Sequence, residues 1–194
     1  VLDRFPLLAI FSISLLLRLA FLGEGYGKEF DAWSNALNAK TIAETGVYEV
    51  SRLPGHPLYE LVLSALWPFN HSYFFFNLLS ALISAGAVVL VFSIARELKL
   101  KQAFYWSLAF GFIPVFFIAS TYTIDYNFAV FFILAAFLAL LRKQYWWLGI
   151  ALGLATGFRI SSLGFLLPFT LWLGFKDFRS LFKMHLAAGL VSIV

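Results

Sequence analysis

Cysteine is absent from the 194 residues, which excludes a disulfide framework, a thiolate metal site and a cysteine nucleophile. Charge is scarce as well, because only 12% of the residues are Asp, Glu, Lys or Arg, whereas 62% are hydrophobic. Soluble domains are roughly half apolar, so these proportions exclude a water-soluble fold. The sequence is therefore that of a membrane protein.

Aromatic residues and a modest positive charge are what the sequence has instead. It contains 24 Phe, 6 Trp and 8 Tyr, and its mean hydropathy is +0.88, a composition that suits lipid-facing walls and interfacial belts. The net charge of +4 does not indicate a nucleic-acid partner, because the basic residues are scattered between apolar segments and form no dense patch.

Apolar segments of near-membrane length recur along the chain, at residues 5–22, 57–69, 73–95, 103–120, 124–141 and 145–175. A bilayer core about 30 Å thick is crossed by roughly 20 helical residues. We expect 57–69 to be interfacial or re-entrant, and 145–175 to split into two short helices at 159–162. The predicted fold is all-α: one polytopic transmembrane domain over residues 1–194, with about six to seven transmembrane helices.

The two ends of the sequence resemble cut ends. The first residue is Val1 rather than Met, and residues 190–194 stop inside an apolar run without a helix-ending signal. We therefore expect the N-terminal part of a longer protein. The first apolar segment is too long for a signal-peptide core and contains Arg18, so we expect it to remain a membrane helix.

The distribution of Lys and Arg predicts the orientation, because cytoplasmic loops carry an excess of these residues. With a cytoplasmic N-terminus, four basic residues lie outside and nine inside, the latter being Arg4, Arg96, Lys99, Lys101, Arg142, Lys143, Lys176, Arg179 and Lys183. Residues 24–56 then form the first extracytoplasmic loop, at the plasma membrane. Seven of the ten acidic residues also lie outside, either for function or simply as part of a solvated loop.

Residues 29–40 of this loop have helical spacing. Asp31, Asn35 and Asn38 share one face, and Trp33, Ala36 and Leu37 share the other. This pattern predicts a helix lying on the membrane, which would hold the Asp31 carboxylate just above the bilayer. An equally open interpretation is that Asp31 only caps the helix N-terminus.

The end of the loop is a rigid turn, in which Pro54, Gly55 and Pro57 precede the next helix. Arg52 and His56 flank the turn. An arginine fork and a helix start are both suited to binding phosphate. Alternatively, Arg52 pairs with Glu49 or lipid headgroups, and His56 is a structural hydrogen-bonding residue.

Three ionisable residues, Arg18, Asp125 and Arg159, lie in or at the ends of apolar segments. Such residues are costly in hydrocarbon and usually face a protein interior or a water-filled cavity. Arg18 lies close enough to the end of its segment to be a mere anchor at the outer surface. Asp125 and Arg159 belong to the same outer side, so we expect one cavity to hold both.

The order of these residues resembles that of the C-type glycosyltransferase superfamily, which includes protein O-mannosyltransferases and aminoarabinose transferases. A first span ending in Leu17-Arg18-Leu19 is followed by Glu29-Phe30-Asp31, and then by Arg52-Leu53-Pro54-Gly55-His56-Pro57-Leu58-Tyr59. Asp125 opens a later span, and Gly153-Leu154-Ala155-Thr156-Gly157-Phe158-Arg159 is similar to a recurring Gly-rich stretch that ends in Arg.

The resemblance implies transfer of a sugar from a polyprenyl-phosphate donor to an acceptor hydroxyl of a protein, lipid or glycan. Many members have two adjacent acidic residues here, whereas Phe30 separates Glu29 from Asp31. It implies Asp31 as the general base, with Glu29 as the other candidate. Arg52, Arg159 and Arg18 would neutralise the departing phosphate, and Asn35, His56 and Asp125 would line the donor site.

Cofactors and rival functions stay open. The sequence requires no cofactor, and two carboxylates on separate loops, Asp31 and Asp125, are a weak signal for a divalent metal. A transporter or flippase of an anionic substrate would use the same intramembrane charges, although no internal repeat of the kind expected for it is visible. A non-catalytic membrane scaffold is the third possibility.

Overall fold

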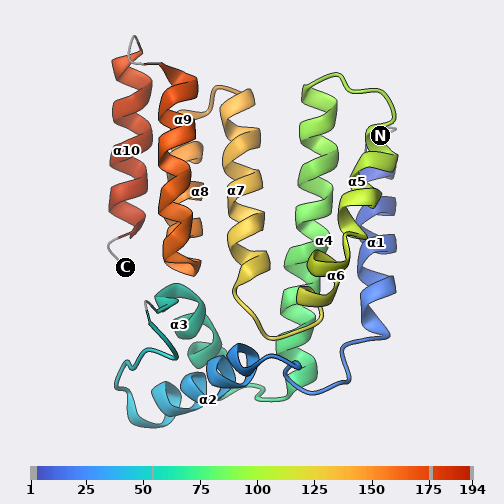
Figure 1. The fold of residues 1–194 in the computed structure, drawn as a ribbon, viewed down its shortest axis with the longest axis vertical. Helices are drawn as coiled ribbons and strands as arrows, with labels where there is room; N and C mark the ends of the chain where they lie inside the picture. The colour runs from blue at the N-terminus through green and yellow to red at the C-terminus, as the bar shows by residue number, and fades with distance from the viewer. Residues whose placement is uncertain (1–3, 54, 175–176, 193–194) are drawn as a thin grey trace.

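A computed structural model describes residues 4–53, 55–174 and 177–192, and Figure 1 shows its fold. Within these residues the only regular secondary structure is helical, which confirms the all-α prediction. The helices are α1 (Arg4–Leu19), α2 (Phe30–Thr45), α3 (Pro57–Leu66), α4 (Tyr73–Glu97), α5 (Ala103–Gly111), α6 (Pro114–Ala119), α7 (Tyr126–Leu141), α8 (Tyr145–Phe158), the 3₁₀ helix η1 (Ile160–Phe165), α9 (Leu166–Leu173) and α10 (Phe178–Ser192).

The longer helices stand side by side, and α2 and α3 cross beneath one end of them (Figure 1). We call this end the α2–α3 end. The packing order is α1, α4, α7, α8 and α10, with α5 against α1 and α4, and with α3 under α8. The chain leaves α1 and enters α4 and α7 at the α2–α3 end, so this end collects the loops on which the candidate residues lie.

Glycines let α8 approach its neighbours closely. A Cβ atom on Gly149 would come within 2.3 Å of the Met184 backbone oxygen in α10, and one on Gly153 within 2.8 Å of the Ala188 oxygen. At the other end of α8, a Cβ atom on Gly157 would lie 3.2 Å from the Cβ of Leu58 in α3. Small residues that permit such backbone contact are typical of helix pairs in membranes.

The segment 103–120, predicted as one span, is not a continuous helix but is broken into α5 and α6. Pro114 begins α6. A proline has no N–H to donate and disfavours helical backbone at the preceding residue, and Ile113 is accordingly extended at ψ 121°. The predicted break at 159–162 is confirmed, since α8 ends at Phe158 and η1 and α9 follow.

Among the described residues, α4 alone is both long and apolar enough to cross a bilayer as one helix, and the other apolar helices are shorter. The number of transmembrane helices thus stays a prediction. The basic residues assigned to the inner side include Arg96 at the end of α4 and Arg142 at the end of α7, both opposite the α2–α3 end (Figure 1). Lys176 lies outside the described residues.

Candidate active site

The helix predicted within loop 24–56 forms as α2, but its faces differ from the prediction. Asn35 and Asn38 do share a face, which is buried against the protein together with Ala36, whereas Trp33 and Leu37 are exposed. Buried amides are tolerated when they are hydrogen-bonded. Asn38 donates to the Glu49 carbonyl at 2.7 Å, and the Asn35 side chain accepts from the Ser51 hydroxyl at 3.2 Å.

A fully buried carboxylate, Glu60 of α3, holds the loop that carries Arg52. Glu60 Oε1 accepts the Ser51 backbone N–H at 2.8 Å and the Ser51 hydroxyl at 2.5 Å. Its Oε2 accepts the Tyr48 hydroxyl at 2.6 Å. Burial first, and then the hydrogen bond and charge of Glu60, raise the pKa of Tyr48. Glu60 therefore holds the loop at Tyr48 and at Ser51, and Ser51 directly precedes Arg52.

Asp125 is at the centre of the charged cluster, and no part of it is exposed. Its Oδ2 accepts a hydrogen bond from Arg159 Nη1 at 2.7 Å and lies 3.5 Å from His56 Nδ1. Its Oδ1 lies 3.8 Å from Arg52 Nη2 and has no hydrogen-bond partner within the described part of the chain. Asp125 and Arg159, which were expected to share one cavity, are in direct contact.

Arg52 links the two carboxylates of the cluster. Its Nη1 donates to Asp31 Oδ2, its Nε donates to His56 Nε2 at 3.1 Å, and its Nη2 faces Asp125. Asp31 Oδ2 also accepts the Tyr126 hydroxyl at 3.3 Å. Arg52 thus pairs with Asp31 and Asp125, and the alternative in which its partner is Glu49 is wrong. Asp31 is an ion-pair partner rather than a cap, since Glu29 occupies the N-cap position of α2.

Access differs among the charged side chains. Asp125 is 0% exposed, Asp31 19%, Arg52 29% and Arg159 32%. The Arg159 guanidinium lies 4.3 Å from the centre of the Tyr126 ring, a cation–π distance. Asp31 and the two arginines therefore form an accessible layer, and Asp125 lies beneath it.

The electrostatics of the cluster favour a neutral histidine between charged arginines. Burial lowers the pKa of His56; the positive charges of Arg52 and Arg159 lower it further, while Asp125 and Glu60 oppose them. Burial disfavours the charge of Arg52 as well, but its contact with Tyr126 and the carboxylates of Asp31 and Asp125 outweigh that effect and raise its pKa. An anion entering here meets the guanidinium groups of Arg52 and Arg159.

Two predicted site residues lie apart from this cluster. Arg18 is 1% exposed and donates to the Ser120 hydroxyl, the Ser14 carbonyl and hydroxyl, and the Gly111 carbonyl. It is therefore a buried residue that ties α1 to α5 and to the end of α6, and the interpretation as a surface anchor is wrong. Glu29 is exposed and lines a separate pocket of about 580 Å³ with Glu24 and Lys28.

The two carboxylates considered as ligands of a divalent metal, Asp31 and Asp125, lie against cationic side chains. Asp31 faces Arg52, and Asp125 faces Arg159 and Arg52, so both carboxylates already have cationic partners. Over the described ranges there is no group of three or more His, Asp or Glu residues placed to hold a metal ion.

Pro54 of the predicted turn lies outside the described residues, whereas Gly55 has a positive φ of 95°, a conformation that suits glycine.

Sequence reasoning missed Tyr126 and the clamp made by Glu60, Ser51 and Tyr48. Tyr126 follows Asp125 directly in the sequence, and this adjacency is the signal that could have indicated it. Glu60 stands three residues after Pro57 in an otherwise apolar helix, and an acid in such a place is costly unless it is hydrogen-bonded.

Comparison with known proteins identifies the lineage of the chain. The sequence model of glycosyltransferase family 87 matches residues 56–194. This range includes His56, Asp125 and Arg159, and it leaves out Asp31 and Arg52. No curated protein and no solved structure matches the chain.

Proposed function

The chain belongs to glycosyltransferase family 87, a membrane family of the C-type superfamily, and on this premise we propose that it uses a polyprenyl-phosphate sugar as donor. The transfer takes place at the α2–α3 end, onto a hydroxyl of a protein, lipid or glycan. The observation that supports this most is the pairing of an accessible carboxylate, Asp31, with a guanidinium, Arg52, that a phosphate can also bind.

The two arginines form the phosphate site in this proposal. Guanidinium groups present planar donors that match phosphate oxygens. Arg52 and Arg159 both approach Asp125, which is buried and holds them on the same side of the cluster. Asp125 and His56 are thus positioning residues, because they orient arginine side chains that are themselves partly exposed.

Donor binding and base activation are coupled through Arg52. Without donor, Arg52 Nη1 is bound to Asp31. A donor phosphate competes for this guanidinium, and Asp31 is then released to accept a proton. The acceptor oxygen attacks the anomeric carbon as its proton passes to Asp31. The bond from the anomeric carbon to the phosphate oxygen breaks, and its electron pair leaves with the lipid phosphate, whose charge Arg52 and Arg159 stabilise.

The same proposal fixes the orientation of the chain. The N-terminus is cytoplasmic, residues 24–56 form the first extracytoplasmic loop, and the whole chain is one transmembrane domain of the plasma membrane. The excess of Lys and Arg at the end opposite α2 and α3 supports this orientation, as do the exposed Trp33 and Leu37 on α2, which suit a helix at the membrane surface.

The test uses the full-length protein in membranes with a labelled polyprenyl-phosphate sugar. We expect Asp31→Asn to lower transfer by about 10²–10⁴-fold, the usual contribution of a general base, without loss of donor binding. Glu29→Gln, two residues away and outside the cluster, is the matched control. If both variants transfer sugar equally, Asp31 is not the general base. If labelled lipid crosses the membrane without sugar transfer, the result favours a transporter.

A further inference from the structure

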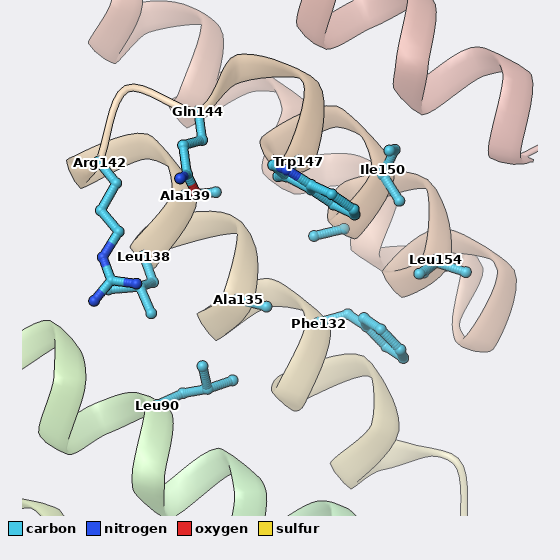
Figure 2. A pocket seen from close by; sticks show the side chains of 11 residues that line it. Leu90, Phe132, Ala135, Leu138, Ala139, Arg142, Gln144, Trp147, Ile150 and Leu154 are labelled. Carbon is cyan, nitrogen blue, oxygen red and sulfur yellow. The ribbon is translucent and has the colours of Figure 1, made fainter. Parts of the chain in front are cut away.

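Tyr126 is the first residue of α7, and it directly follows the buried Asp125. It lies at the α2–α3 end (Figure 1), whereas the other half of the helix lines an apolar pocket of about 260 Å³ with Phe132, Ala135 and Leu138 (Figure 2). Tyr126 is partly buried. Its side chain belongs to the charged cluster, but the steps of the proposed transfer do not involve it.

Tyr126 contacts both halves of the proposed site. Its hydroxyl donates to Asp31 Oδ2 at 3.3 Å, and the centre of its ring lies 4.3 Å from the guanidinium carbon of Arg159. Asp31 is the proposed base, and Arg159 is one of the two arginines proposed to bind the donor phosphate. A single aromatic side chain therefore connects the base to the phosphate site.

The hydrogen bonds of Asp31 end on one of its two oxygens. Arg52 Nη1 and the Tyr126 hydroxyl both donate to Oδ2, and no donor from the described residues is bound to Oδ1. The Asp31 side chain is partly exposed. Oδ1 is therefore the oxygen that is left to accept the proton of the acceptor hydroxyl.

A phosphate that binds Arg52 would remove one of the two bonds that hold Asp31. The carboxylate has two rotatable side-chain bonds and would be free to turn away if nothing else held it. The bond from the Tyr126 hydroxyl remains. The tyrosine is itself held, because its ring lies against Arg159, and Arg159 donates to Asp125 Oδ2 at 2.7 Å.

We propose that Tyr126 is a positioning residue for the transfer. Its hydroxyl keeps Asp31 oriented after the donor phosphate has taken Arg52, and its ring keeps Arg159 facing that phosphate. This inference deepens the proposed function and rests on it. A tyrosine that only packed in the fold would change the amount of folded protein and leave the rate per folded molecule unchanged.

The test measures kcat and the donor KM of the full-length protein in membranes with a labelled polyprenyl-phosphate sugar, per amount of folded protein. Tyr126→Phe removes the hydroxyl and keeps the ring. We expect kcat to fall about tenfold, the order of one hydrogen bond to a charged group, and the donor KM to stay within about twofold. Tyr126→Leu also removes the ring, so we expect a similar loss in kcat and a rise of about two- to fivefold in donor KM, the order of one cation–π contact.

Two substitutions are the matched controls. Tyr73→Phe removes a hydroxyl from the first residue of α4, where the ring contacts Tyr26. Ala135→Leu adds volume on α7 inside the pocket of Figure 2, and about 14 Å of helix separates it from Tyr126. Both variants should keep the native kcat and donor KM.

The outcomes separate the role of Tyr126 from the proposed function. If the native protein transfers sugar and Tyr126→Phe keeps the native kcat, the role of Tyr126 is overturned and the proposed function stands. The same conclusion follows if Tyr73→Phe lowers kcat equally, or if the loss disappears once rates are related to folded protein. Absence of transfer by the native protein would instead refute the proposed function, and the role of Tyr126 with it.

Discussion

Replacing Glu60 by glutamine would keep the shape of a buried side chain and remove its charge. The carboxylate accepts three hydrogen bonds, two from Ser51 and one from Tyr48. Bonds to a charged acceptor contribute about 1.5–3 kcal/mol each, against about 0.5–1.5 for neutral ones. The three bonds together would lose about 3 kcal/mol, of which part is regained because no charge is buried in the variant.

A net loss of about 2 kcal/mol corresponds to a fall of about 4–8 °C in melting temperature for a chain of this size. The loop from Tyr48 to Arg52 would also become more mobile. We therefore expect the rate of sugar transfer to decrease by more than the loss of folded protein explains. Both quantities are measured on the same preparation, by thermal unfolding in detergent and by transfer of labelled sugar below the transition of the variant.

Glu49→Gln is the matched control, because Glu49 is exposed and only its backbone carbonyl contacts Asn38. It should melt and transfer as the native protein does. If Glu60→Gln behaved like Glu49→Gln in both assays, the buried hydrogen bonds would contribute nothing, and the idea that Glu60 positions Arg52 would be refuted.

Three further outcomes follow from the cluster and the helix packing. Asp125→Asn leaves Arg159 without its anionic partner and should destabilise the protein by about 3 kcal/mol. Adding Arg159→Gln to this variant should recover part of the lost stability, as measured by thermal unfolding. If the losses of the two substitutions were additive, the two residues would not be coupled. Gly149→Ala should cost about 1–3 kcal/mol by overpacking, while Gly164→Ala, which meets open space, should cost far less in the same assay; equal losses would contradict the close packing of α8. The lowered pKa of His56 means that the unfolded chain binds the proton first, so stability should fall as pH drops below about 6.5, and His56→Gln should reduce this slope in pH-dependent unfolding; an unchanged slope would rule out His56 as its source.

The helices, the break at Arg159 and the meeting of Asp125 with Arg159 could be predicted from the sequence. The helices and the break could be predicted because the length of an apolar segment and the positions of its charges are local features of the sequence. The contact of Asp125 with Arg159 could be predicted because an ionisable residue at membrane depth needs a partner and few are present there. The helix of the outer loop was predicted over residues 29–40 from the spacing of its polar and apolar side chains, and α2 covers Phe30–Thr45.

The facing of α2 and the break at Pro114 were missed for different reasons. Asn38 donates to the Glu49 carbonyl and Asn35 accepts from the Ser51 hydroxyl, both in the loop that follows α2, so their burial depends on a tertiary contact that helical spacing does not contain. The break was a matter of local sequence, since Pro114 stands in the middle of an apolar run and its effect on the preceding residue is general. Arg18 was misplaced because its partners Ser120 and Gly111 lie about a hundred residues away in sequence.

The glycines of α8 bring this helix against two distant parts of the protein, the backbone of α10 and the Leu58 side chain at the start of α3. Gly149 and Gly153 lie against the backbone of α10, and Gly157 lies against Leu58, in the first turn of α3. Side chains can absorb a shift between helices by changing rotamers, but the contacts of Gly149 and Gly153 with backbone oxygens of α10 leave no such freedom between α8 and α10. A displacement of α10 would therefore be passed along α8 to the turn that holds His56. Whatever packs on α10 from outside has a mechanical route to the charged cluster.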